Sequence, residues 1–259
     1  MLGKLIKYDL KWINKYMLIY FIIGFIFAIL CKITSQFTNV FIGLILDKIC
    51  SSIEIGCLVS IFVNCIMRCW VRFKNNTYKD ESYLTHTLPV SKGTIYNSKI
   101  LATFISIALA LLIILLCFSI VWLNDIVIEQ IKTFFENKEA VKIFISVCLI
   151  SVLEITYLAF CGIIGIILGH KTNNHKTLRS VFIGLMIYGI LQSILACIII
   201  IFGAFNEDVR QLYMNNIETL ESTSGVKTLM YLCIGVYLIY NIGFYVFGKK
   251  MLEKGVNVD

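Results

Sequence analysis

The sequence predicts an all-α membrane protein with six transmembrane helices. Hydrophobic residues make up 59% of the 259 residues and charged residues only 15%, whereas soluble domains carry about 25% charged residues. The mean hydropathy is +0.85. The apolar residues also gather in runs of about 20, which is the length that a helix needs to cross a hydrocarbon core of roughly 30 Å.

Six apolar runs are long enough to be spans. Inside a bilayer each run must be a helix or a strand of a closed barrel, because no water satisfies the backbone, and continuous apolar runs exclude alternating barrel strands. The start of the second run is the least defined, since Asp47 and Lys48 follow the apolar residues 40–46. The expected spans are Tyr16–Cys31, Ile49–Met67, Ile100–Leu123, Ile143–Gly169, Val181–Phe202 and Thr228–Phe247.

The basic residues predict the orientation, because loops rich in lysine and arginine are retained on the cytoplasmic side. With a cytoplasmic N-terminus, 16 of the 23 basic residues fall on that side, and most acidic residues fall on the other. We therefore expect a multi-pass protein of the cytoplasmic membrane with both termini in the cytoplasm. A basic inner face suits anionic lipid headgroups and requires no nucleic acid as a partner.

Three segments outside the spans have the spacing of amphipathic helices. Residues 1–15 are expected to lie in the interface, either as an anchor or as an elbow helix that also braces a neighbouring domain. Residues 124–142 and 203–227 are expected on the outer side. The apolar faces comprise Leu2, Leu5, Ile6, Leu10 and Ile13, then Val127, Ile131, Phe134 and Phe135, then Val209, Leu212, Tyr213, Ile217 and Leu220.

The longest polar interruption on the expected cytoplasmic side, residues 68–99, contains the only proline of the chain, Pro89. Proline disfavours a helical conformation of the preceding residue, so a helix over residues 77–87 should end before Leu88. Ser91 is then placed to cap the helix that leads into the third span. The simpler alternative is a solvated loop in which Pro89 only turns the chain.

This segment resembles the permease subunits of type-2 ABC exporters. The similar residues are the acidic pair Asp80–Glu81, then Tyr83–Leu84–Thr85, Leu88–Pro89–Val90–Ser91, and Ser98–Lys99 before an apolar span. Residues 5–11 (LIKYDLK) are similar to the start of those proteins. His86, between two threonines, departs from the usual pattern. The resemblance extends to the number of helices and the arrangement of loops.

In that family a coupling helix in this loop docks into a groove of a separate cytoplasmic ATPase. The resemblance implies that Tyr83 and Leu84 enter the groove, that Asp80 and Glu81 make polar contacts, and that Pro89 ends the helix. Two apolar side chains would supply affinity, and the charges would set the register. It also implies two permease subunits, either two copies or one copy and a related chain, around a path for an amphipathic substrate such as a peptide, lipid or antibiotic.

The chain is expected to be a non-catalytic subunit of a single transmembrane domain, residues 1–259. A phosphate-binding loop ends in lysine followed by a hydroxyl residue. Gly243, Gly248 and Lys249 imitate this spacing, but Lys250 replaces the hydroxyl residue. ATP and magnesium are therefore expected in the partner ATPase. The alternative function is an ATPase-independent small membrane transporter or a membrane sensor subunit, although paired repeats and broken spans, which are typical of secondary transporters, are not visible.

Cysteines and histidines predict no metal site in this chain. Most of the ten cysteines lie within apolar runs, where a thiol behaves as a small hydrophobe, and no CxxC spacing occurs. Cys31 and Cys50, both near the outer face, are the only pair expected to be capable of a disulfide. His170 and His175 are expected in a short solvated turn, with too few ligands for a metal.

Glu154 is the polar residue within the spans that most requires an explanation. An ionised carboxylate midway through a span costs several kcal/mol unless it is paired, hydrated or protonated. Two roles remain open: part of a substrate path, or a structural hydrogen bond between helices or subunits. Asn64 is a second candidate for the substrate path. Glu54, Gln192 and Asn241 are polar residues of the same kind, expected mainly to hold helices together.

Small residues in the fourth run predict close helix packing. Gly165 and Gly169 are separated by three residues. This small-xxx-small spacing lets the backbones of two membrane helices approach closely.

Overall fold

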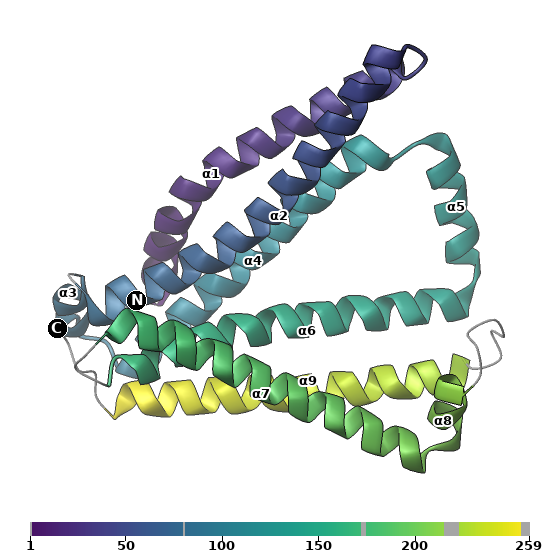
Figure 1. Cartoon of the computed structure of the whole chain (residues 1–259). Helices are drawn as coiled ribbons and strands as arrows, with labels where there is room; N and C mark the ends of the chain where they lie inside the picture. Colours follow the sequence, from purple (N-terminus) through teal and green to yellow (C-terminus); the bar gives the residue numbers. More distant parts are fainter. Residues whose placement is uncertain (1, 80, 172–174, 215–222, 255–259) are drawn as a thin grey trace. The chain divides into compact units, whose positions relative to one another are not determined.

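The computed structural model describes residues 2–79, 81–171, 175–214 and 223–254. Within these residues, six helices are long and apolar enough to cross a membrane. The chain is therefore an all-helical protein whose composition and helix lengths suit a multi-pass membrane protein, as predicted. These helices (Figure 1) are α1 (Leu2–Thr34), α2 (Phe41–Tyr78), α4 (Lys92–Trp122), α6 (Lys138–Gly169), α7 (Lys176–Phe205) and α9 (Thr223–Glu253).

In the described connections between the long helices lie four short ones: η1 (Ser35–Phe37), α3 (Ser82–Thr87), α5 (Asp125–Glu136) and α8 (Glu207–Met214). Helices α5 and α8 lie in the two segments, 124–142 and 203–227, that were expected to contain amphipathic helices. The predicted apolar positions Ile217 and Leu220 fall outside the described residues.

The long helices extend past the apolar runs from which they were predicted. Helix α1 continues from Leu2 without a break near residue 15, so the segment expected to lie in the interface belongs to the same helix as the first span. Helix α2 has 38 residues and is about 57 Å long at 1.5 Å per residue, well beyond a hydrocarbon core of roughly 30 Å. The polar ends of these helices are therefore available to form a site outside the hydrocarbon.

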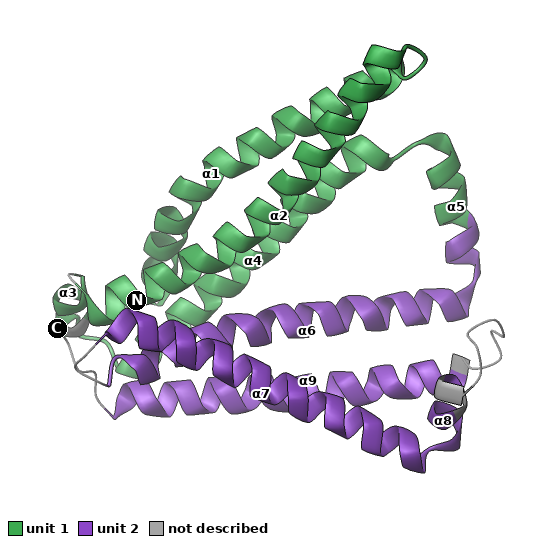
Figure 2. Cartoon of the chain, in the orientation of Figure 1, with its two compact units in different colours: residues 1–132, 258–259 green, residues 133–257 purple. Residues whose placement is uncertain are grey.

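The helices pack into two compact units (Figure 2), residues 1–132 with 258–259, and residues 133–257. In unit 1, helices α1, α2 and α4 all pack on one another, and α3 contacts α2. In unit 2, helix α6 packs against both α7 and α9, and α8 packs against the same two helices. The division between the units falls within α5.

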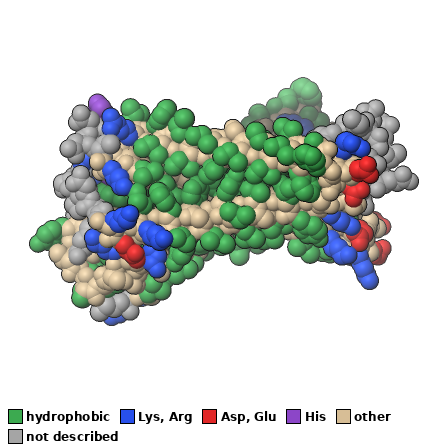
Figure 3. Space-filling view, turned by 90° about the horizontal axis from the view of Figure 1, so that it is seen from below, with side chains coloured by type: hydrophobic (Ala, Val, Ile, Leu, Met, Phe, Trp, Pro, Cys, Tyr) green, Lys and Arg blue, Asp and Glu red, His purple; other side chains and the backbone are tan. Residues whose placement is uncertain are grey.

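Large hydrophobic side chains cover the outside of the long helices. In α7 only Ser180, Gly184, Leu195 and Gly203 are buried, whereas leucine, isoleucine and phenylalanine side chains along its length are exposed. Figure 3 shows hydrophobic side chains across one face, with lysine, arginine, aspartate and glutamate gathered toward its two ends. Such a surface is unsuited to water and matches the acyl chains of a bilayer.

The packing of α6 against α7 confirms the prediction made from Gly165 and Gly169. A methyl group added at Gly165 would lie 2.5 Å from the carbonyl oxygen of Ser180 and 2.8 Å from the Cα of Gly184. One added at Gly169 would collide with Ser180. The two backbones therefore touch where only glycine allows the approach.

The core of unit 2 is aromatic. Tyr157 of α6 stacks on Tyr188 of α7, with ring centroids 5.4 Å apart, and on Phe244 of α9, at 5.8 Å. Its hydroxyl donates a hydrogen bond to the carbonyl oxygen of Tyr188 at 3.0 Å. Tyr157 thus joins three helices through ring contacts and satisfies its own polar atom, as buried tyrosines usually do.

Candidate functional site

Helix α3 is delimited by Pro89 and by the capping residue Ser91. Leu88 has φ −63° and ψ 139°, the extended conformation that a following proline favours, and α3 ends at Thr87. The Oγ atom of Ser91 accepts a hydrogen bond of 3.3 Å from the backbone N–H of Thr94, which caps the first turn of α4. Both local predictions are confirmed.

The prediction of one helix over residues 77–87 is wrong in its first half. Thr77 and Tyr78 belong to the last turn of α2 and are buried there. Lys79 leaves the helix with an extended backbone, φ −112° and ψ −157°, and α3 begins only at Ser82. Thr77 and Tyr78 are thus buried as the end of α2 and do not form the start of α3. Asp80, one of the expected coupling residues, lies outside the described residues.

In the first turn of α3 the apolar Tyr83 and Leu84 point outward, whereas the polar Ser82 and Thr85 point inward. Tyr83 is 74% exposed and Leu84 is 68% exposed, whereas Ser82 and Thr85 are buried. The Thr85 hydroxyl donates a hydrogen bond of 2.9 Å to the carbonyl oxygen of Glu81. A surface helix usually turns its apolar side chains toward the core and its polar side chains outward. Here two adjacent apolar side chains are exposed instead.

Glu81, expected to make a polar contact with a partner, forms an ion pair within the chain. Its Oε2 atom lies 2.6 Å from the Nη1 atom of Arg72 on α2, and its side chain is 44% exposed. The carboxylate therefore contacts Arg72 and is at the same time partly exposed at the surface. It ties the beginning of α3 to the long helix that precedes it.

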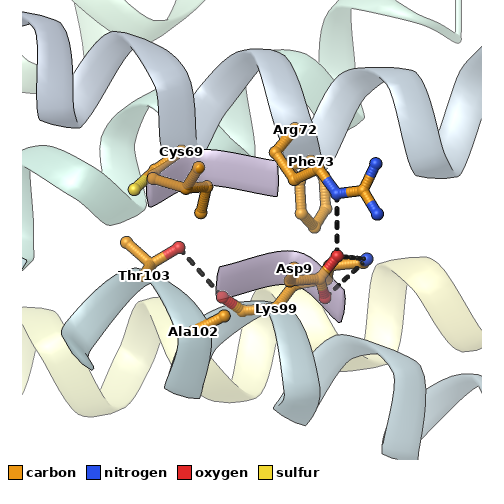
Figure 4. Close-up of a pocket in the computed structure, with 8 residues that line it drawn as sticks. Asp9, Cys69, Arg72, Phe73, Lys99, Ala102 and Thr103 are labelled. Carbon is orange, nitrogen blue, oxygen red and sulfur yellow. Dashed lines mark hydrogen bonds and ion pairs between the residues drawn. The ribbon is translucent and has the colours of Figure 1, made fainter. Parts of the chain in front are cut away.

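Arg72 also belongs to a buried charge cluster at this end of unit 1 (Figure 4), formed with Asp9 and Lys99. Asp9 of α1 is 1% exposed. Its Oδ1 atom accepts hydrogen bonds from the Nε atom of Arg72 at 2.8 Å and from the Nζ atom of Lys99 at 2.6 Å. The amide of Asn76 approaches the same oxygen at 3.3 Å. The cluster thus joins α1, α2 and α4 around one carboxylate.

The charges of this cluster are balanced. Asp9 and Glu81 carry two negative charges, and Arg72 and Lys99 carry two positive charges, which is the condition for keeping charged groups away from water. The guanidinium of Arg72 also lies 5.3 Å from the ring centroid of Trp12, a cation–π distance. A cavity of about 10 Å³ beside Asp9, Arg72 and Lys99 is just large enough for one water molecule. A carboxylate held by two cations is suited to a rigid connection between helices.

Reasoning from the sequence missed this cluster. It placed Asp9 in an interfacial segment, Arg72 in a basic run and Lys99 at the start of a span. The available signal was the buried stripe of α1, in which Asp9 precedes Ile13, Met17 and Phe21 at intervals of four. A charged residue in register with such a stripe faces the inside of the bundle, where a partner of opposite charge stabilises it.

The two candidates for a substrate path lie in different units. Asn64 is in α2 of unit 1, and its amide donates a hydrogen bond of 2.9 Å to the carbonyl oxygen of Ser60, one turn earlier. Glu154 is in α6 of unit 2, half-buried, and its Oε1 atom accepts a hydrogen bond of 3.3 Å from Gln192 of α7. Gln192 in turn contacts the hydroxyl of Tyr237 of α9 at 3.2 Å. Glu154 therefore takes part in a bond between helices.

The expectation of a solvated turn is wrong for His170, although His175 is exposed. His170 is buried at the end of α6, where its Nδ1 atom lies 2.9 Å from the carbonyl oxygen of Ile166 and 3.3 Å from the hydroxyl of Ser180. The close approach of α6 and α7 encloses it. Cys31 and Cys50, the expected candidates for a disulfide, are both free thiols.

No protein-family model matches the sequence, and neither a similar curated protein nor a similar solved structure was found.

Proposed function

We propose that this protein is the transmembrane subunit of an ATP-driven ABC exporter that moves an amphipathic substrate across the cytoplasmic membrane. A separate cytoplasmic ATPase would bind ATP and magnesium, and α3 would be the surface that it contacts. The proposal rests on the resemblance of residues 80–99 to type-2 exporter permeases. Six helices of spanning length support it.

The observation that carries the proposal is the exposed apolar pair on α3. Tyr83 and Leu84 are adjacent, largely exposed, and lie on a six-residue helix between the second and third span-length helices. Exposed aromatic and aliphatic side chains of this kind are typical anchors of protein interfaces. Their place in the chain is the place at which the resemblance puts the coupling residues.

The ion pairs behind α3 provide a route for a mechanical signal. A push on α3 would reach Glu81, pass to Arg72 of α2 over 2.6 Å, and then reach Asp9 of α1 over 2.8 Å. Lys99 extends the connection to α4. In this mechanism ATP binding in the partner moves α3 as a rigid body, and the charge cluster moves α1, α2 and α4 with it.

The apolar outer faces of the long helices support two further proposed partners, the lipid membrane and a second permease subunit. They suit lipid, and they suit a second permease subunit, either another copy or a related chain, with which this chain would enclose the path. Apolar walls with few charges suit an amphipathic cargo such as a peptide, lipid or antibiotic. Glu154 and Asn64 remain the proposed contacts of that path.

The test replaces Tyr83 and Leu84 by aspartate and measures ATPase binding. The full chain would be co-expressed with each ABC ATPase encoded near its gene, solubilised and purified by a tag on the chain alone. We expect the wild type to retain the ATPase and the double variant to lose it, because charged side chains cannot enter an apolar groove. The control is Tyr8→Asp, which places one aspartate at an exposed tyrosine of α1, outside α3.

Two results would contradict the proposal. Equal recovery of the ATPase with the wild type and the double variant would remove α3 as the docking surface. Failure of the wild type to bind any ABC ATPase would favour the ATPase-independent transporter or sensor instead.

A further inference from the structure

Glu54 is a second buried carboxyl group of unit 1, and among the described residues it has no hydrogen-bond partner. Its side chain, on α2, is 0% exposed. Both carboxyl oxygens are buried, and neither forms a hydrogen bond with any described residue. It lies about one and a half turns inside the apolar run that begins at Ile49. The expectation that Glu54 holds helices together by a hydrogen bond is therefore wrong for the described part of the chain.

Asp9 and Glu54 both lie between helices α1, α2 and α4, but their surroundings differ. Asp9 is surrounded by Arg72, Lys99 and Asn76, which supply charge and hydrogen bonds. Unit 1 therefore surrounds the carboxylate of Asp9 with compensating positive charge. In the described part of the chain neither oxygen of Glu54 accepts a hydrogen bond, so a negative charge there would not be compensated in this way.

The groups around Glu54 cannot compensate a negative charge. The thiols of Cys31 on α1, Cys57 on α2 and Cys117 on α4 lie close enough to Glu54 to interact with it electrostatically, and Asp47 and Cys50 act on Cys31 in turn. Lys32, in the last turn of α1, donates its hydrogen bond to the carbonyl oxygen of Leu123 instead. Thiols and a second carboxyl group offer no positive charge.

The three helices that carry Glu54 and its neighbours are closely packed along their buried faces. Ala28, Cys31, Ile61 and Cys117 are fully buried in the same three helices. A methyl group added at Gly24 of α1 would already lie 3.0 Å from Ile61 and 3.7 Å from the sulfur of Cys117. Sodium, magnesium or calcium would require several oxygen ligands, whereas one carboxyl group among thiols supplies two.

We infer that Glu54 is a proton-binding site, occupied by a proton at neutral pH while α1, α2 and α4 are packed together. An unpaired carboxyl group in an apolar surrounding takes the neutral form, because the ionised form would lose its hydration and gain no hydrogen bond or opposite charge in exchange. Separation of the three helices would admit water to the carboxyl group and release the proton. Proton occupancy and helix packing in unit 1 are thus linked. The inference does not depend on an ATPase partner.

Infrared spectroscopy of the full chain in lipid nanodiscs at pH 7 tests the inference. The difference spectrum between the wild type and Glu54→Gln should contain the C=O stretching band of a protonated carboxylic acid, present only in the wild type and shifted in D₂O. The glutamine variant should fold with an unchanged unfolding midpoint, because an amide has the shape and charge of the neutral acid. A difference spectrum with carboxylate bands and no acid band would overturn the inference.

Glu139→Gln is the matched control. Glu139 is half-exposed and paired with Lys142 and Lys227, so this variant should lose carboxylate bands and no acid band. Should Glu54→Gln fail to fold, the infrared spectra of the wild type in H₂O and D₂O at pH 7 can be compared. The acid C=O band should be present and should shift in D₂O, because ionised carboxylates give no such band. Absence of any acid band would count against the inference.

Discussion

The Nζ atom of Lys99 lies 2.6 Å from one carboxylate oxygen of Asp9 and 2.7 Å from the other. This contact joins positions 90 residues apart in the sequence, on α4 and α1. Arg72 of α2 binds the same carboxylate, so the three long helices of unit 1 meet at one negative charge. The strength of such a cluster depends on every member being present.

Asp9→Asn should therefore destabilise unit 1 strongly. The substitution leaves two cations buried around a neutral amide, and loss of one partner of a buried pair costs about 3–5 kcal/mol. Thermal unfolding of the purified chain in detergent would show a lowered midpoint. Lys142→Met, which removes an exposed ion pair with Glu139, should leave the midpoint unchanged. Equal midpoints for Asp9→Asn and the wild type would mean that the cluster has no structural role.

Glu81→Gln should loosen α3 while preserving the bundle. The Arg72–Glu81 pair is partly exposed, so its loss should cost about 1 kcal/mol or less of stability. Amide hydrogen exchange of residues 82–87 should nevertheless become faster, because α3 loses its tie to α2. Thr87→Ala changes an exposed side chain of the same helix and serves as the control. Exchange rates that match the wild type in Glu81→Gln would show that α3 is held by other contacts.

Gly165→Ala should separate α6 from α7. The added methyl group meets backbone atoms of Ser180 and Gly184, which cannot move aside as a flexible side chain can. Overpacking of this kind costs about 1–3 kcal/mol. Gly189→Ala on α7 is the matched control, since a methyl group there has no heavy atom within 4 Å. The two variants should differ in thermal unfolding, and a similar midpoint for both would refute close packing at Gly165.

Glu154→Gln should distinguish the two roles of that residue. A glutamine can still accept the hydrogen bond from Gln192, so stability should remain close to that of the wild type. Gln192→Leu, in contrast, removes bonds to Glu154 and Tyr237 and should cost about 1–3 kcal/mol. Transport measured in proteoliposomes adds the functional comparison. Unaltered transport by Glu154→Gln would remove Glu154 from the substrate path.

Local chemistry explains why several elements could be predicted from the sequence. Pro89 restricts the backbone of Leu88, and the Ser91 hydroxyl reaches the N–H of Thr94; both effects act within a few residues. The spacing of Gly165 and Gly169 likewise implied a close helix contact. It could not identify Ser180 and Gly184 as the residues that they contact, because these residues lie on another helix, α7.

The helix boundary near residue 79 shows the limit of such reasoning. The sequence favoured one helix over residues 77–87, but Thr77 and Tyr78 are buried at the end of α2, and α3 starts again at Ser82. Burial of a helix end depends on the segments that pack against it, and the local sequence does not show which segments these are. His170 was misplaced for the same reason, since the approach of α7 encloses it.

The sequence by itself determined that this chain is helical, apolar enough to span a membrane six times, and interrupted by a short helix that ends before Pro89. These properties follow from run lengths and from backbone restrictions within a few residues. Only the tertiary structure decided that Asp9 is paired with Arg72 and Lys99, whereas Glu54 is buried with no hydrogen-bond partner among the described residues. The physical reason is that the state of a buried charge depends on groups from other helices, which only packing brings within a few ångströms.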